Sequence, residues 1–345
     1  MMASVIELTH QHRPDIRVHS YPTPKTSVAC KPGGVHIRAY NPSMPLRHNL
    51  LALAIATIWG LTFVSIKIGL QTVPPFALCG WRFFLAAVPL VFFVGKPQVA
   101  WRWLVVYALF IAVGQFSVMF ISLNMGMPAG LMSLVVQTQV FFTIALAVGF
   151  FGESVHRLHI FGALIAALGL VTIGLTKLQG GIAGAFLLVL VAALFWGAGN
   201  TVAKHVARRA VGGRVSPMNF IAWSSLAAVP PLVLISLAYE PAGALWTPIT
   251  SPSWALAFHL CVLAYAAQVF GYGLWSNLLT RYPASAVSPF ALWVPVAGMS
   301  ATALAFGETL TSLQLLGVVI VLIGLATAVL GPSFLLRASS IKRGT

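Results

Sequence analysis

The sequence predicts an all-α membrane protein whose ten transmembrane helices form two inverted five-helix repeats, with both termini in the cytoplasm. Three observations lead to this prediction: the composition, the placement of lysine and arginine, and a set of motifs that occurs twice. Of the 345 residues, 59% are hydrophobic and 7% are charged, whereas soluble domains carry about a quarter charged residues. The apolar runs are long and do not alternate with polar residues as barrel strands do, so helical spans are expected.

Ten apolar runs have the length that a membrane-crossing helix needs, which is about 20 residues. They lie at residues 49–68, 76–95, 103–122, 128–150, 159–176, 183–203, 218–238, 254–277, 284–306 and 313–331. The segments between them are short, so no separate soluble domain is expected among the spans. We expect residues 334–345 to form a basic cytoplasmic tail.

Residues 1–46 are polar and rich in proline, and they lack the apolar core of a secretory signal peptide. We expect a disordered tail here. Its histidines and Cys30 do not follow the spacing of a structural zinc site, so no metal is expected. Met44 opens a sequence that is typical of the start of a membrane protein, which makes the preceding segment a candidate extension of a shorter native chain.

Lysine and arginine are distributed unequally between the two sides of the predicted spans. With the N-terminus in the cytoplasm, 17 of the 20 basic residues fall on the cytoplasmic side, and only Lys67, Arg82 and Lys177 fall on the other. Because cytoplasmic loops are enriched in positive charge, this bias predicts the orientation and an even number of spans. It also accounts for the net charge of +15 without nucleic acid as a partner.

The motifs of the first five spans occur again in the last five. The matching segments are Trp59-Gly60 with Trp196-Gly197, Lys67 with Lys204, Leu85–Pro89 with Leu226–Pro230, Phe151-Gly152-Glu153 with Phe306-Gly307-Glu308, and Gly162 and Gly169 with Gly317 and Gly324. Because each repeat has an odd number of spans, the second copy crosses in the opposite direction, and a substrate site is expected at the interface. We expect the repeats at residues 47–178 and 179–333. A duplication that only builds a stable bundle is the alternative.

Several stretches resemble EamA-type transporters of the drug/metabolite transporter superfamily. These are Trp59-Gly-Leu-Thr-Phe-Val-Ser-Ile-Lys67, Gly80-Trp-Arg-Phe83 and the two Phe-Gly-Glu endings. Asn124–Thr143, Gly271–Trp275 and Val294–Gly298 look most like the O-acetylserine/cysteine exporter branch. The resemblance covers about residues 46–335 and departs from that branch in the long N-terminal tail.

The resemblance implies a secondary transporter of the bacterial inner membrane that exports small amino-acid metabolites, similar to O-acetylserine and cysteine, by alternating access. Export of another small metabolite or a drug is one alternative, and a non-transporting membrane scaffold or receptor is the other. The implied partners are an amino-acid-type substrate and the lipid bilayer. The chain is expected to be a monomer or a weak homodimer.

Polar groups inside spans are costly, so they are candidates for substrate binding. Trp59 and Lys67 share one face of the first span, and Trp196, Asn200 and Lys204 share the matching face of the sixth. A lysine near each mouth suits the carboxylate of an amino acid. The alternative is that both lysines extend to the lipid headgroups.

The eighth span carries Tyr265, Gln268, Tyr272 and Trp275 at the spacing of one α-helical face. Amphipathic aromatic and amide groups in one stripe suit the wall of a cavity for a zwitterionic solute. A hydrogen-bonded seam between helices, with a tryptophan at the membrane interface, is the alternative.

Further candidates lie in the second, third and fourth spans. Gln115 is a single candidate, and Arg82 either caps carbonyl groups or contacts a substrate carboxylate. In the fourth span Gln137 shares a face with Ser133, whereas an ideal α-helix directs Gln139 away from that face. The prolines Pro289 and Pro295 predict a local break in the ninth span that exposes carbonyl groups.

Acidic residues are few and none lies in the middle of a span. The five are Glu7, Asp15, Glu153, Glu240 and Glu308. Ion coupling through a buried carboxylate is therefore disfavoured, and His259 is the histidine placed well inside a span. Glu153 and Glu308 are expected to pair with cations or helix N-termini. No catalytic residue, cofactor or ATP-binding loop is expected, so the chain is not predicted to be an enzyme.

Overall fold

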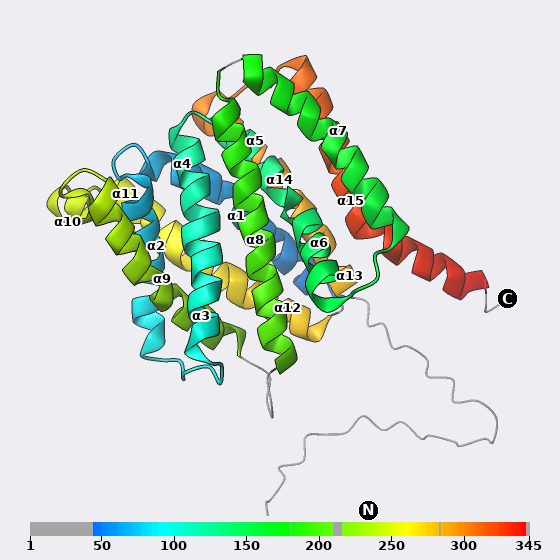
Figure 1. The fold of residues 1–345 in the computed structure, drawn as a ribbon, viewed down its shortest axis with the longest axis horizontal. Coiled ribbons are helices and arrows are strands. Elements are labelled where there is room, and N and C mark those ends of the chain that lie inside the picture. The colour runs from blue at the N-terminus through cyan, green and yellow to red at the C-terminus, as the bar shows by residue number, and fades with distance from the viewer. Residues whose placement is uncertain (1–43, 180, 210–215, 283, 343–345) are drawn as a thin grey trace, which may run out of the picture. The chain divides into compact units, whose positions relative to one another are not determined.

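The computed structural model describes residues 44–179, 181–209, 216–282 and 284–342. The segment before Met44, with its histidines and Cys30, lies outside the described residues, so the expectations for it stay predictions. Every regular element in the described residues is helical, which confirms the all-α prediction (Figure 1).

The first half of the chain contains α1 (Leu46–Gly69), α2 (Pro75–Val91), the run α3 (Trp101–Ala108), η1 (Leu109–Ser117) and α4 (Val118–Asn124), the run α5 (Ala129–Val135), η2 (Val136–Thr138) and α6 (Gln139–Phe151), and α7 (Arg157–Gln179). The second half contains α8 (Ala183–Arg209), α9 (Pro217–Tyr239), η3 (Ala244–Trp246), α10 (Thr247–Thr250), the run α11 (Trp254–Cys261), η4 (Val262–Gly271) and α12 (Tyr272–Arg281), the run α13 (Ala284–Val287), η5 (Ser288–Leu292) and α14 (Trp293–Phe306), and α15 (Ser312–Lys342). The segments η1 and η4 are π-helical, and the other η segments are 3-10 helices.

Within the described ranges, nine helices or helical runs are long and apolar enough to cross a membrane. The helix α2 is also apolar but has only 17 residues. Large apolar side chains point outward from the bundle; on α7, Leu164 and Leu168 are 60% and 65% exposed. Such faces suit lipid rather than water, so the chain is a multi-pass membrane protein. The helix α15 continues to Lys342 and includes part of the segment that was expected as a tail.

The principal helix pairs join the two halves of the chain. The helices α7 and α15 run side by side (Figure 1), and α2 packs on α9, α1 on α14, and α6 on α8. A Cβ atom at Gly162 would lie 2.5 Å from the carbonyl oxygen of Gly324, and one at Gly60 would lie 2.7 Å from the backbone nitrogen of Gly298. Glycine therefore permits these backbones to approach, and the contacts lie within one chain.

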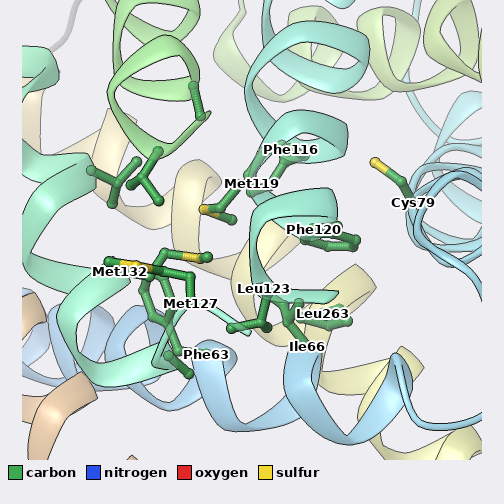
Figure 2. Packing of buried hydrophobic residues seen from close by; sticks show 14 of the residues in the cluster. Phe63, Ile66, Cys79, Phe116, Met119, Phe120, Leu123, Met127, Met132 and Leu263 are labelled. Carbon is green, nitrogen blue, oxygen red and sulfur yellow. The ribbon is translucent and has the colours of Figure 1, made fainter. Parts of the chain in front are cut away.

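Apolar side chains fill the bundle where α1 ends and α5 begins, which we call the Lys67 end. There Phe63 and Ile66 of α1 are buried with Leu123 of α4, Met127 of the following connection and Met132 of α5 (Figure 2). The opposite end, where α8 ends and α7 begins, is called the Lys204 end. Because apolar packing closes the bundle at the Lys67 end, a cavity inside the bundle can open only toward the Lys204 end.

Candidate functional site

A cavity of about 670 Å³ lies among the helices of both halves. Its wall is mostly apolar. Eight of the predicted site residues line it: Trp59, Arg82, Gln115, Gln137, Trp196, Asn200, Tyr272 and Trp275. It extends toward the Lys204 end, where His159, Ala203 and Leu279 contribute to the wall. Its size falls in the range of about 300–1,000 Å³ that is usual for small-molecule sites.

The guanidinium of Arg82 is the strongest polar feature of the cavity wall. The residue lies in the middle of α2 and is 2% exposed. Its Nη2 donates to Oε1 of Gln268 at 3.2 Å, and its Cζ lies 3.8 Å from the ring centre of Phe116. Its Nε and Nη1 are buried without a hydrogen-bond partner among the described residues. Unpaired buried donors are costly, so this side chain is suited to an anionic ligand in the cavity.

Three aromatic rings form the wall near the α1–α12 contact. The ring centre of Trp59 lies 5.0 Å from that of Tyr272 and 5.1 Å from that of Trp275. The Nε1 of Trp59 donates to the carbonyl of Ala267 at 3.2 Å. A Cβ atom at Gly271 would lie 2.6 Å from that same nitrogen, so the glycine makes room for the tryptophan. These rings give the site flat apolar surfaces against which the body of a solute can pack.

Both Gln137 and Gln139 line the cavity, so the expectation that Gln139 points away is wrong. The cause is the 3-10 turn of η2, which changes the angular spacing that an ideal α-helix would keep. Gln137 donates from Nε2 to the carbonyl of Ala291 at 3.0 Å, in the 3-10 segment η5 that contains Pro289. Oε1 of Gln139 accepts from Asn200 Nδ2 at 2.9 Å.

Two predicted residues of the eighth span, Tyr265 and Gln268, do not line the cavity. They lie in η4, whose π-helical turns contain more residues than α-helical turns, so the predicted stripe does not stay on one face. Tyr265 packs beside Ala86 and Val269, and Gln268 acts through its hydrogen bond to Arg82. The alternative of an interhelical seam thus describes these two residues.

The two lysines also lie outside the cavity wall, because each is held by a glutamate. Lys67 Nζ lies 2.6 Å from Glu308 Oε1, and Lys204 Nζ lies 2.6 Å from Glu153 Oε2. Glu308 also accepts from the backbone nitrogens of Ala129 at 3.1 Å and Gly130 at 2.9 Å, at the start of α5. Each glutamate thereby joins helices from both halves of the chain.

Both glutamates have lowered pKa values. Burial alone raises the pKa of Glu308, but the hydrogen bonds from Lys67, Gly130 and Ala129 outweigh burial and hold it below its ordinary value. The hydrogen bond from Lys204 is the largest cause that lowers the pKa of Glu153, and Arg208 adds to it. Both carboxylates are therefore ionised at neutral pH, and both are already bound to a lysine of the protein.

The sequence prediction missed several residues of the cavity wall. Tyr107 and Met119 line it, together with Thr62, Phe63, His159 and Ser276. A periodic signal existed for two of them: Phe63 follows Trp59 by four residues, and Ser276 follows Tyr272 by four. His159 had no such signal, because it reaches the wall from the first turn of α7.

Comparisons with known proteins agree with this architecture. The EamA-like transporter family matches residues 46–175 and 183–330. Relatives from Salmonella typhimurium and Escherichia coli K12, each named a probable amino-acid metabolite efflux pump, are 39% and 38% identical over 84% of this chain and 96% of their own length. An uncharacterized inner membrane transporter of Escherichia coli K12 is 25% identical over 84% of this chain and 92% of its length. A solved crystal structure, 18% identical, has a TM-score of 0.57 over 82% of this chain and 97% of that chain.

Proposed function

Because the chain belongs to the EamA-like transporter family, we propose that it exports small amino-acid metabolites of the O-acetylserine and cysteine type across a bacterial inner membrane. The chain is a membrane transporter and not an enzyme. The names of its relatives support the cargo class, and Arg82 in the cavity wall supports a cargo that carries a carboxylate.

The observation that carries the proposal is the guanidinium of Arg82 in the cavity wall, two of whose nitrogens have no hydrogen-bond partner among the described residues. A carboxylate in the cavity would accept from Nε or Nη1, the two nitrogens that lack a partner among the described residues. A hydrogen bond between a guanidinium and a carboxylate is charge-assisted on both sides and is therefore strong. The body of the solute would then rest against Trp59 and Tyr272, whose rings line the same cavity.

The transport cycle is proposed to be alternating access between two inverted repeats, residues 47–178 and 179–333. Ten crossings with both termini in the cytoplasm fit if α2, with 17 residues, is a short span. A short span is tolerated by local thinning of the bilayer. In this orientation the Lys67 end faces outward and the cavity opens toward the cytoplasm, which is where an exporter loads its cargo.

The pairing of helices across the halves supports this cycle. The contacts α1 with α14 and α6 with α8 are related by exchange of the two repeats, as are the pairs Lys67–Glu308 and Lys204–Glu153. Such symmetry provides two equivalent conformations of the transporter, one open at the Lys204 end and the other open at the Lys67 end.

The test is exchange of labelled cysteine and O-acetylserine by the purified full chain in proteoliposomes. We expect exchange by the native protein and a loss of about 100-fold for Arg82→Gln, because a buried charge pair is worth about 2–5 kcal/mol. Arg102→Gln, which changes an exposed arginine at the start of α3, is the matched control and should exchange normally. Native rates for Arg82→Gln would reject the role of Arg82, and no exchange of any amino-acid metabolite would favour the scaffold or receptor.

A further inference from the structure

The cavity wall carries a fixed positive charge but no acidic side chain among the described residues that line it. Arg82 supplies that charge. The other basic group of the wall, His159, can only add positive charge when it is protonated. An α-amino acid brings both a carboxylate and an ammonium group into this space, and only the carboxylate meets an opposite charge.

The acids elsewhere in the described chain are already engaged. Glu308 binds Lys67 and the first amides of α5, and Glu153 binds Lys204 and Arg208. Glu240 accepts from the backbone nitrogens of Phe76 and Ala77 at the start of α2 and from Ser236. None of the three lines the cavity, so an ammonium group there must be held by neutral oxygens and aromatic rings.

Neutral partners hold an ammonium group poorly when water is removed. Taking an ammonium ion out of water costs more than a cation–π contact returns. The wall does carry neutral oxygens, and one of them, Oε1 of Gln139, already accepts from both Asn200 and Thr143. Oε1 of Gln115 is buried without a partner among the described residues, but neutral oxygens of this kind do not replace an anion.

From this imbalance we infer that the site selects monocarboxylates whose nitrogen is uncharged or absent, such as N-acylated amino acids and 2-oxo acids. This inference rests on the proposed function, because it takes the Arg82 cavity as the cargo site. The carboxylate neutralises Arg82, the apolar wall takes the body of the solute, and the free amine of an ordinary amino acid is tolerated rather than recognised.

Four ligands built on one carbon–sulfur skeleton test the inference by titration calorimetry on the purified full chain in nanodiscs. S-methyl-L-cysteine has both charges, 3-(methylthio)propanoate has the carboxylate alone, and S-methyl-L-cysteine methyl ester has the ammonium alone. We expect the propanoate to bind at least tenfold more tightly than the zwitterion, and the ester not to bind. N-acetyl-S-methyl-L-cysteine should bind like the propanoate, because its nitrogen carries no charge.

The variant Gln139→Glu supplies the missing acid. A glutamate there keeps both hydrogen bonds, since the native Oε1 is already an acceptor for Asn200 and Thr143. It should reverse the order, so that the zwitterion binds more tightly than the propanoate. Gln71→Glu, which adds the same charge at an exposed position between α1 and α2, is the matched control and should keep the native order.

Tighter binding of the zwitterion than of the propanoate by the native protein would overturn the inference, and so would an unchanged order in Gln139→Glu. Either result leaves the proposed function intact as long as cysteine is exchanged in proteoliposomes. Failure of the proposed function is recognised separately, because none of the carboxylates would then bind and no amino-acid metabolite would exchange.

Discussion

The Nζ atom of Lys67 lies 2.6 Å from Oε1 of Glu308, although the two residues are 241 positions apart in the sequence. Glu308 also accepts hydrogen bonds from the first amides of α5, so one carboxylate ties together α1, α5 and the end of α14. A positive charge and the N-terminus of a helix both stabilise this anion. The Lys67 end of the bundle is therefore closed by a polar contact as well as by apolar packing.

Replacing Glu308 by glutamine should destabilise the folded protein by about 1–3 kcal/mol, because the negative charge opposite Lys67 is lost and an amide nitrogen replaces one of the two accepting oxygens. Glu153→Gln should destabilise it less, since the Glu153 side chain is 33% exposed against 15% for Glu308 and water screens its pair. Thermal unfolding of both purified variants in one detergent shows which variant loses more stability. A larger loss for Glu153→Gln would contradict this account of the contact.

The lowered pKa of Glu308 fixes the pH range over which its contact stabilises the fold. A depressed folded-state pKa contributes stability that is fully present above the ordinary value of about 4.3 and is lost as the pH falls through the folded value. The stability difference between the native protein and Glu308→Gln should therefore be constant from about pH 6 to pH 8 and shrink only in acid. Melting temperatures of both proteins across that range provide the measurement. A difference that already declines between pH 8 and pH 6 would point to a histidine instead.

The close contact of α7 with α15 predicts a strict requirement for glycine at Gly162. A Cβ atom there would lie 2.5 Å from a backbone oxygen and 2.8 Å from a backbone nitrogen, neither of which can rotate away. Gly162→Ala should cost about 1–3 kcal/mol, as overpacked cores do. Gly149→Ala on α6 is the control, because no atom lies within 4 Å of its added Cβ. Equal melting temperatures for the two variants would show that the pair can separate freely.

Much of the helical framework could be predicted because lipid imposes a simple rule on each span. The apolar run predicted at residues 103–122 corresponds to Trp101–Asn124, and the run at 218–238 corresponds to α9. The rule fails where the helix is not α-helical. Tyr265 was misplaced by the π-helical segment η4 and Gln139 by the 3-10 turn η2, because hydropathy and spacing carry no signal for either irregularity.

The lysine and glutamate motifs show a second limit of sequence reasoning. Lys67, Lys204, Glu153 and Glu308 were all recognisable as repeated positions. Which lysine meets which glutamate depends on how the two halves interlock, and that is a property of the tertiary packing. Likewise, only the surroundings of Arg82 in the fold show that two of its nitrogens lack a partner among the described residues.

The last prediction concerns the backbone that supports the aromatic wall. In Gly271→Ala the new Cβ would lie 2.6 Å from Nε1 of Trp59, which is held in place by the carbonyl of Ala267. The indole must move, and the wall that it forms with Tyr272 should lose its shape. Gly273→Ala, two residues along, is the matched control: its Cβ would meet the flexible end of the Met218 side chain at 2.6 Å, which can turn away. We therefore expect cysteine exchange to fall about tenfold in Gly271→Ala, equivalent to about 1.4 kcal/mol, and to stay near the native rate in Gly273→Ala. Equal loss in both variants would show that the helix itself, rather than the position of Trp59, limits transport.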